Sequence, residues 1–338
     1  MDRGKDYYQN KLKHLQQLER EDRKDDVKKQ IKKGECSITP LPVVATQPFR
    51  SDLTLERHPL FVVNGYKENF FIHEREVKHP DSGEVIVQRV MVGKLTKESK
   101  QSYGVLKQVH QEIFYKLLKL WGELGYPLEG KNGVIETTVY QIVMYLKGHD
   151  TAPLYNRVRH LLRDLSSIPI TLENAYTWQG VHDLDEFTLV EGVIWNGRKL
   201  DKATMLPKPG KESKVRIKIS ETITSGFLHK EMKQILWRPY SELGGQGKGR
   251  RAEVARLLYP LLDYELSSKK SYHIALKALF RRLGMKSHQY RSKRREKLLP
   301  ALNQLQGKPI LAEKYKLDLT LRASSDGQDY ILVASRVT

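Results

Sequence analysis

The feature that most limits the fold of this chain is a change in the spacing of its apolar residues, which occurs twice in the same order. In the first half, apolar residues recur every three or four positions and predict three successive helices. These are expected over residues 106–124, 139–146 and 154–165, and a loop containing Gly130 and Gly133 precedes the second. Thr137 and Thr138 can cap that second helix. Runs typical of strands follow at residues 168–176, 187–195 and 215–219.

The same order returns toward the carboxyl terminus. A glycine-rich loop at residues 244–249 opens a helix, and two further helices are expected over about 274–283, capped by Ser271, and 289–305. Strand-like runs at 310–321 and 330–333 flank the turn 324–327, and residues 235–240 are also expected to form a strand. Two helices joined by a turn and followed by a hairpin are typical of a winged helix. The sequence therefore predicts an α+β fold with two tandem winged-helix domains.

A charged N-terminal arm precedes the two domains. Residues 1–50 alternate charges of both signs, and Pro40, Pro42 and Pro48 mark their end. We expect a solvated arm that is flexible or partly helical. The first winged-helix domain is expected over residues 51–230, including a hairpin formed by residues 70–74 and 85–92, and the second over residues 231–338.

The charge of the chain favours a polyanionic partner. Lys and Arg number 59 against 40 Asp and Glu, which gives a net charge of +19. Residues 245–297 alone hold 15 basic and four acidic residues, so +11 of the +19 lies there. Because these basic residues alternate with apolar residues at helical spacing, a folded surface is expected to present them, and double-stranded DNA is the expected partner.

The composition favours a cytoplasmic protein without a cofactor. The one cysteine, Cys36, cannot form a disulfide within the chain, and a metal site built from thiolates needs more than one cysteine. The mean hydropathy is −0.57, and no apolar run approaches the length that crosses a membrane. The first thirty residues also lack the apolar core of a signal peptide. We expect no membrane association, no metal and no cofactor.

Two residue patterns of nucleic-acid enzymes are missing or incomplete. No two of the 11 histidines stand two positions apart, as a metal-dependent nickase with a nucleophilic tyrosine would require. The segment Gly125–Lys131 resembles a phosphate-binding loop, but Asn132 stands where Ser or Thr should bind magnesium. We therefore expect no enzymatic activity. The glycine loop 244–249 is either a hinge or a phosphate contact.

In a helix-turn-helix, the first turns of the second helix face base edges, and flanking cations contact phosphates. The second domain supplies most of the candidates. Its base-reading residues are expected to be His288, Gln289, Arg291, Ser292 and Arg295, and its phosphate contacts Lys248, Arg250, Arg251, Arg281, Lys286, Lys293 and Arg294. In the first domain, Tyr155, Asn156 and Arg159 are candidates for bases and Arg163 for a phosphate. The alternative for that helix is an exposed amphipathic helix without DNA contacts.

Several segments in this order resemble the theta-type plasmid replication initiators, the iteron-binding family with two winged-helix domains, and in particular its replication initiator A-like branch. The resemblance covers about residues 52–320. The segments are His58-Pro-Leu-Phe61, residues 103–124, Tyr155–Leu165 with Ile168-Pro-Ile170, Ile235–Tyr240, Arg251–Tyr259 and Ala275–Gly284.

The resemblance implies a non-enzymatic protein of the bacterial cytoplasm that is associated with the nucleoid or a plasmid. Such proteins bind direct repeats at an origin, help to open adjacent duplex, and recruit the host initiator and the replicative helicase. The resemblance also implies main base readout by the second domain, and accessory DNA contacts and dimerisation by the first. A free homodimer that becomes a monomer on DNA is expected. The family pattern assigns no role to the charged arm.

Two other functions fit the same patterns less fully. A winged-helix transcriptional regulator, such as an autorepressor, would use the same DNA contacts without starting replication. A strand-cleaving enzyme is disfavoured because the histidine pair is missing.

Overall fold

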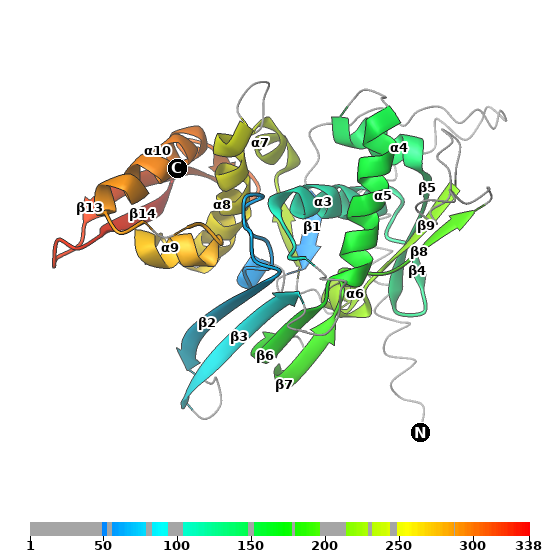
Figure 1. Ribbon diagram of the computed structural model, residues 1–338, viewed down its shortest axis with the longest axis horizontal. Coiled ribbons are helices and arrows are strands. Elements are labelled where there is room, and N and C mark those ends of the chain that lie inside the picture. The colour runs from blue at the N-terminus through cyan, green and yellow to red at the C-terminus, as the bar shows by residue number, and fades with distance from the viewer. Residues whose placement is uncertain are drawn as a thin grey trace.

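The computed structural model of the chain describes residues 49–52, 56–78, 83–93, 104–147, 152–177, 180–196, 214–228, 232–243, 249–286 and 288–338. The chain folds into two parts that lie side by side (Figure 1). Both parts mix helices and strands. Of the arm expected over residues 1–50, residues 1–48 lie outside the described residues, and residues 49 and 50 begin strand β1 (Phe49–Asp52).

The first part holds helices α3 (Gln108–Glu123), α4 (Val139–Lys147), α5 (Ala152–Ser167) and α6 (Glu221–Leu228), and strands β2 (Phe70–Lys78), β3 (Val85–Gly93), β4 (Leu128–Glu129), β5 (Asn132–Thr138), β6 (Ile170–Thr177), β7 (Gly180–Phe187), β8 (Val190–Asn196) and β9 (Lys214–Ile219). The three helices and the β2–β3 hairpin predicted from apolar spacing are confirmed. Thr138 caps α4 as expected, because its hydroxyl accepts a hydrogen bond from the amide of Gln141 at 3.1 Å.

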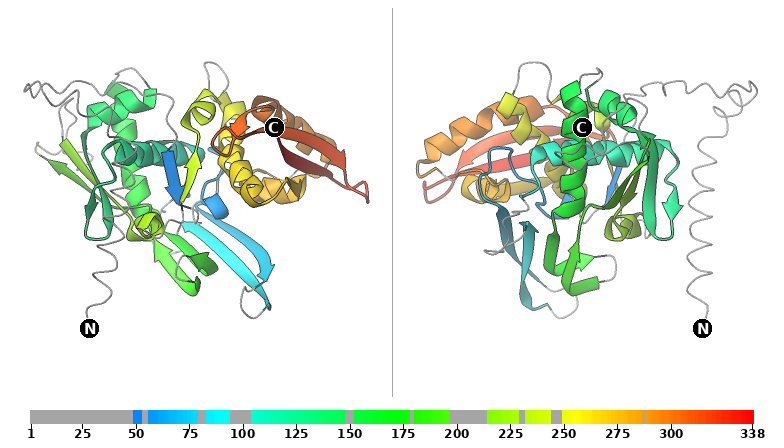
Figure 2. Two further views of the ribbon diagram at one scale, coloured as in Figure 1. Left: turned by 180° about the vertical axis from the view of Figure 1, so that it is seen from behind. Right: turned by 45° about the vertical axis from the view of Figure 1, so that its right-hand side comes forward.

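The strands of the first part form two antiparallel sheets. One has the order β4-β5-β9-β8, and the other has the order β2-β3-β6-β7. The second sheet projects from the same side of the molecule in all three views (Figures 1 and 2). Strands β6 and β7 of this sheet come between α5 and β8 in the chain. They therefore do not join the sheet of β8 and β9, which packs against α5.

The expected loop around Gly130 and Gly133 is partly wrong, because residues 132–138 form strand β5. Val134 and Ile135 are buried in this strand. Gly133 lies against the indole of Trp121, where an added Cβ would be 2.9 Å from the ring. The glycine therefore marks a close packing contact in a strand and not a loop.

A two-stranded ribbon connects the parts. It pairs β1 (Phe49–Asp52) with β10 (Met232–Ile235), and α7 (Trp237–Glu242) follows it. The prediction of a strand over residues 235–240 is thus wrong beyond β10. Trp237 and Tyr240 are both buried three positions apart, which is a helical and not an alternating spacing.

The second part contains α8 (Gly249–Ser268), β11 (Ser271–Ala275), α9 (Leu276–Arg282), α10 (Arg291–Leu305), β12 (Pro309–Ile310), β13 (Tyr315–Ala323) and β14 (Tyr330–Val337). Its sheet has the order β11-β14-β13-β12. The expected cap of α9 by Ser271 is wrong, because Ser271 begins β11. The amide of Lys277 in α9 instead donates a hydrogen bond to Oδ2 of Asp329 at 2.8 Å.

Helix α3 lies between α8 and α5 and carries much of the core (Figure 1). Its side chains from Ile113 to Trp121 are all buried. From α8, the Arg256 guanidinium donates to the Glu112 carboxylate of α3 at 2.8 Å. From α7, the Tyr240 hydroxyl donates to Gln111 at 3.3 Å. These contacts hold the two parts in one arrangement.

A buried carboxyl group lies at this junction. Oε1 of Glu56 accepts hydrogen bonds from the Ser51 hydroxyl at 2.6 Å and the Tyr115 hydroxyl at 2.7 Å. Burial raises the pKa of Glu56 to about 7, and the two hydrogen bonds offset only part of this effect.

We expect Glu56→Gln to make the protein more stable than the wild type at pH 8 but not at pH 4.5. The folded state binds the Glu56 proton more tightly than the unfolded state does, so ionisation costs about 3 kcal/mol of stability as pH rises from 4.5 to 7. Glutamine cannot ionise. Urea unfolding of both proteins across this pH range measures their free energies of unfolding. Subtracting one from the other cancels the pH dependence that other groups contribute to both. A difference that does not change with pH would contradict the raised pKa.

Candidate nucleic-acid interface

Helix α10 exposes the residues that sequence reasoning placed near bases. Arg291, Ser292 and Arg295 are exposed on α10, and Gln289 is exposed just before it. His288 is half-buried, with its ring 6.4 Å from that of Phe280. Because positions 288, 291, 292 and 295 follow helical spacing, the three exposed α10 side chains share one face. This arrangement allows them to contact a ligand together.

Basic residues surround this face. The exposed cations from α9 to α10 are Lys277, Arg281, Lys286, Arg291, Lys293, Arg295 and Lys297. Glu296 is the one acid between residues 276 and 297, and it pairs with Lys293 at 2.8 Å. An exposed pair of this kind contributes little to stability. With seven exposed cations against one acid, the surface formed by this segment is strongly positive. The phosphate contacts predicted for Arg281, Lys286 and Lys293 stay predictions.

The turn between β13 and β14 lies beside the start of α10. The guanidinium of Arg291 donates to the carbonyl of Gly327 in this turn. The Asp326 carboxylate accepts hydrogen bonds from the Ser324 hydroxyl at 2.5 Å and the Gln328 amide at 3.0 Å. The Ser324 hydroxyl and the Gln328 amide lower the pKa of Asp326. The turn is thus fixed by its own hydrogen bonds and joined to α10.

Two arginines of α10 also contact the same tyrosine. The Arg291 and Arg295 guanidiniums lie 5.6 and 5.5 Å from the ring centre of Tyr330 in β14. These distances are within the range of cation–π attraction. The two exposed arginines are therefore held at one position between the helix and the hairpin.

The structure corrects the predicted role of Arg294. This residue is 5% exposed, and its guanidinium pairs with the Asp329 carboxylate at 3.0 Å. It also donates to the backbone carbonyls of His288, Gln289 and Gln328. A guanidinium with these partners inside the protein does not reach a phosphate, so the expectation of a phosphate contact is wrong.

Helix α5 of the first part requires a second correction. Tyr155 is 5% exposed and Arg159 is 3% exposed, so both lie in the interior and not on the surface that would face bases. The Arg159 guanidinium lies 5.5 Å from the ring centre of Trp195 in β8 and packs the helix on its sheet. Base reading by these two residues is not compatible with their burial.

The exposed face of α5 carries a different set of residues. Asn156 and Arg163 are exposed as expected, and Arg157 and His160 join them. Sequence reasoning missed the last two as candidates. The signal was present in the apolar positions of this helix, whose spacing places Arg157 and His160 on the opposite face.

Three of the predicted phosphate contacts are not tested by the structure. Lys248 lies outside the described residues. Arg250 and Arg251 belong to the first turn of α8, where their backbone is described and their side chains are not. Their roles stay predictions.

Solved structures resemble this chain at low sequence identity. No protein-family model matches this chain, and no curated protein matches it. A crystal structure of selenomethionine derivatives of domains 2 and 3 of RctB is similar, with a TM-score of 0.49 and 12% identity over 83% of this chain and 95% of that one. A second structure of RctB domains 2–3 gives a TM-score of 0.47 and 11% identity over 85% and 96%. Similarity at this level does not indicate a function, so the function proposed below rests on the residues of this chain.

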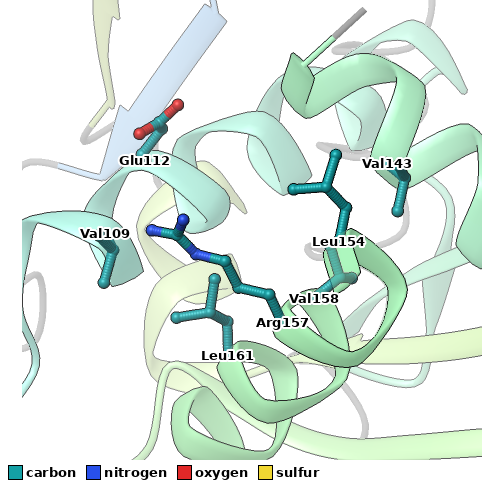
Figure 3. A pocket seen from close by; sticks show the side chains of 7 residues that line it. All are labelled: Val109, Glu112, Val143, Leu154, Arg157, Val158 and Leu161. Carbon is teal, nitrogen blue, oxygen red and sulfur yellow. The ribbon is translucent and has the colours of Figure 1, made fainter. Parts of the chain in front are cut away.

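A small pocket lies between α3, α4 and α5, beside the exposed face of α5 (Figure 3). Five aliphatic side chains line most of it, and Glu112 and Arg157 are its two charged residues. These residues do not form a nucleophile with a base.

In the described part of the chain, no group of three His, Cys, Asp or Glu residues could hold a metal ion. Within the same residues, no helix combines the length and apolarity needed to cross a membrane.

Proposed function

We propose that this chain is a replication initiator that binds repeated double-stranded DNA through two winged-helix units. The observation that carries this proposal is the exposed face of α10, where Arg291, Ser292 and Arg295 stand beside the β13–β14 turn within a basic surface. A guanidinium is suited to paired hydrogen bonds with a guanine edge in the major groove. Helix α10 is the recognition helix in this proposal, and the β13–β14 hairpin is the wing.

The strand pairing in each part supports the winged-helix assignment. In the second part the order is α8, β11, α9, α10, β13 and β14, and β11 pairs with β14. In the first part the order α3, β5, α4, α5, β8 and β9 is the same, and β5 pairs with β9. The β2-β3-β6-β7 sheet is then an addition to the first unit. Asn156, Arg157, His160 and Arg163 on α5 supply its accessory DNA contacts.

The role in initiation follows from the resemblance of this sequence to iteron-binding initiators. In this proposal the protein binds direct repeats at an origin, helps to open the neighbouring duplex, and recruits the host initiator and replicative helicase. It is a cytoplasmic, non-enzymatic protein that is a homodimer when free and a monomer on each repeat. An autorepressor is the second candidate, because the same DNA-binding surface serves a regulator.

Binding to DNA fragments that tile the region around the gene tests this function. At physiological salt and with random competitor DNA, we expect tight, stepwise shifts on one fragment that contains repeats. A plasmid carrying that fragment should replicate only when the protein is made. Repression without replication would favour the autorepressor, and equal binding to all fragments would contradict both.

Within this function, Arg295→Ala and Lys293→Ala should have different effects although the residues are two positions apart. Loss of the Arg295 base contact is expected to weaken binding to the preferred sequence by about 1–3 kcal/mol and to leave random DNA nearly unaffected. Loss of the Lys293 phosphate contact should weaken both similarly and reduce the salt slope by about 1. Titrations at several salt concentrations measure this. Equal losses of discrimination in both variants would refute the assigned roles.

A further inference from the structure

We propose that Asp329 and Tyr330, at the start of β14, are positioning residues that fix the base-reading arginines of α10 relative to the wing. Neither residue is a predicted DNA contact, and both act through arginines of α10. This inference rests on the proposed function and adds to it the means by which sequence discrimination is obtained.

The Asp329 carboxylate connects three elements. Its Oδ1 pairs with the Arg294 guanidinium of α10 at 3.0 Å, and the side chains of this pair are only 6% and 13% exposed. Its Oδ2 accepts from the amide of Lys277 at the start of α9. Its backbone amide donates a hydrogen bond to the Ser324 hydroxyl in the wing turn, at 2.9 Å. One residue thus fixes α9, α10 and the wing relative to one another.

The Arg294 guanidinium fixes the segment that leads into α10. Beyond Asp329, it donates to the carbonyls of His288 and Gln289 before the helix and to Gln328 in the wing. Because the guanidinium is planar and presents its donors in a rigid fork, these bonds define one geometry for the loop and the helix start. A buried cation with this set of partners is well satisfied.

Tyr330 then orients the two exposed arginines. Arg291 and Arg295 stand one helical turn apart, and both guanidiniums lie within 5.6 Å of the centre of this ring. An exposed arginine otherwise samples many rotamers, and ordering it on binding costs affinity. A cation–π contact with the ring requires no N–H donor of the guanidinium, whereas a guanine is recognised by these N–H groups. The ring therefore restricts the arginines without using the groups that read bases.

Substitutions of Tyr330 test the inference in the full-length protein. The probes are the duplex that the wild type enriches from a random library and an unselected random duplex, and the readout is the ratio of the two affinities. Tyr330→Leu is expected to lower this ratio about 5- to 30-fold, since two cation–π contacts are lost. Tyr330→Phe keeps the ring and should keep the ratio within about twofold of the wild type, because the quadrupole of the ring is retained.

A matched control is available in the same sheet. Tyr315 in β13 also makes a cation–π contact, with the Arg336 guanidinium 4.9 Å from its ring centre, but this pair does not involve α10. Tyr315→Leu makes the same chemical change and should leave the ratio unchanged. Partial unfolding lowers both affinities together and does not change their ratio, so a merely structural role would not move this readout.

Asp329→Asn provides an independent variant. It removes the charge that pairs with Arg294 while keeping the size of the side chain, and we expect the ratio to fall as it does in Tyr330→Leu. A ratio equal to that of the wild type in both Tyr330→Leu and Asp329→Asn would overturn the positioning role alone. A wild-type protein that enriches no sequence would overturn the proposed function together with this inference.

Discussion

Replacing Gly284 with alanine is expected to destabilise the protein by about 2–5 kcal/mol, from left-handed backbone strain and overpacking together. Gly284 follows the C-cap residue of α9 and has a φ of +62°, a left-handed backbone conformation that residues with a Cβ disfavour. A Cβ at position 284 would also be 2.7 Å from Cβ and Cγ1 of Val62. Val62 is fully buried, and its backbone forms hydrogen bonds with Leu106 and Gln108 at the start of α3. Val62 cannot move without disturbing the junction of the two parts.

Gly307→Ala is the matched control for this substitution. Gly307 has a φ of +71°, but nothing lies within 4 Å of the position that a Cβ would take. It should therefore cost only the backbone strain, about 1–2 kcal/mol. Chemical denaturation of both variants measures the two costs. Equal destabilisation would show that the contact with Val62 adds nothing, which would contradict the close packing at the junction.

Lys233→Met is expected to cost about 3–5 kcal/mol of stability, because it leaves a buried carboxylate without its partner. Lys233 in β10 pairs with Asp263 in α8 at 2.8 Å, and their side chains are 8% and 3% exposed. Burial lowers the pKa of Lys233 and raises that of Asp263. Asp263 also accepts a hydrogen bond from the amide of Leu311 at 2.7 Å, so the pair joins the connecting ribbon to α8 and to the turn that follows β12 in the second part.

The double variant Lys233→Met, Asp263→Asn tests the cause of this loss. With both charges removed, no buried ion remains, and asparagine can still accept from the Leu311 amide. We expect the double variant to be more stable than Lys233→Met alone, with a coupling energy of about 0.5–3 kcal/mol in a double-mutant cycle. Losses that simply add would contradict the ion pair as the source of the effect.

Helical spacing alone predicted most of the helices, including α10 to within two residues of its start. The apolar positions Leu298, Leu302 and Leu305 set its inward face, and all three are buried. Position 294 lies one turn before Leu298 on this face, so its burial follows from the same spacing. A charged residue there requires a buried partner, and that partner is Asp329, 35 positions away. Only the tertiary structure brings the two together, so the sequence alone favoured an outward arginine.

The β-structure was harder to predict, because strand pairing is not local. Glycine is typical of loops, and the packing of Trp121 against Gly133 could not be inferred from neighbouring residues. The β3–β6 pairing joins strands that are separated by α3, α4 and α5, and no local pattern indicates it. In α5, the error at Tyr155 and Arg159 had another cause. Polar residue type was given more weight than the position of each residue relative to Val158 and Leu162.

Selection from a random library of duplex DNA tests the central claim most directly, because that claim is sequence-specific binding through α10. The wild type, at physiological salt, is expected to enrich one motif, and Arg291→Ala with Arg295→Ala should lose that enrichment while still binding DNA in low salt. Circular dichroism of the double variant establishes that it is folded. Enrichment of the same motif by the double variant, or of no motif by the wild type, would contradict the account.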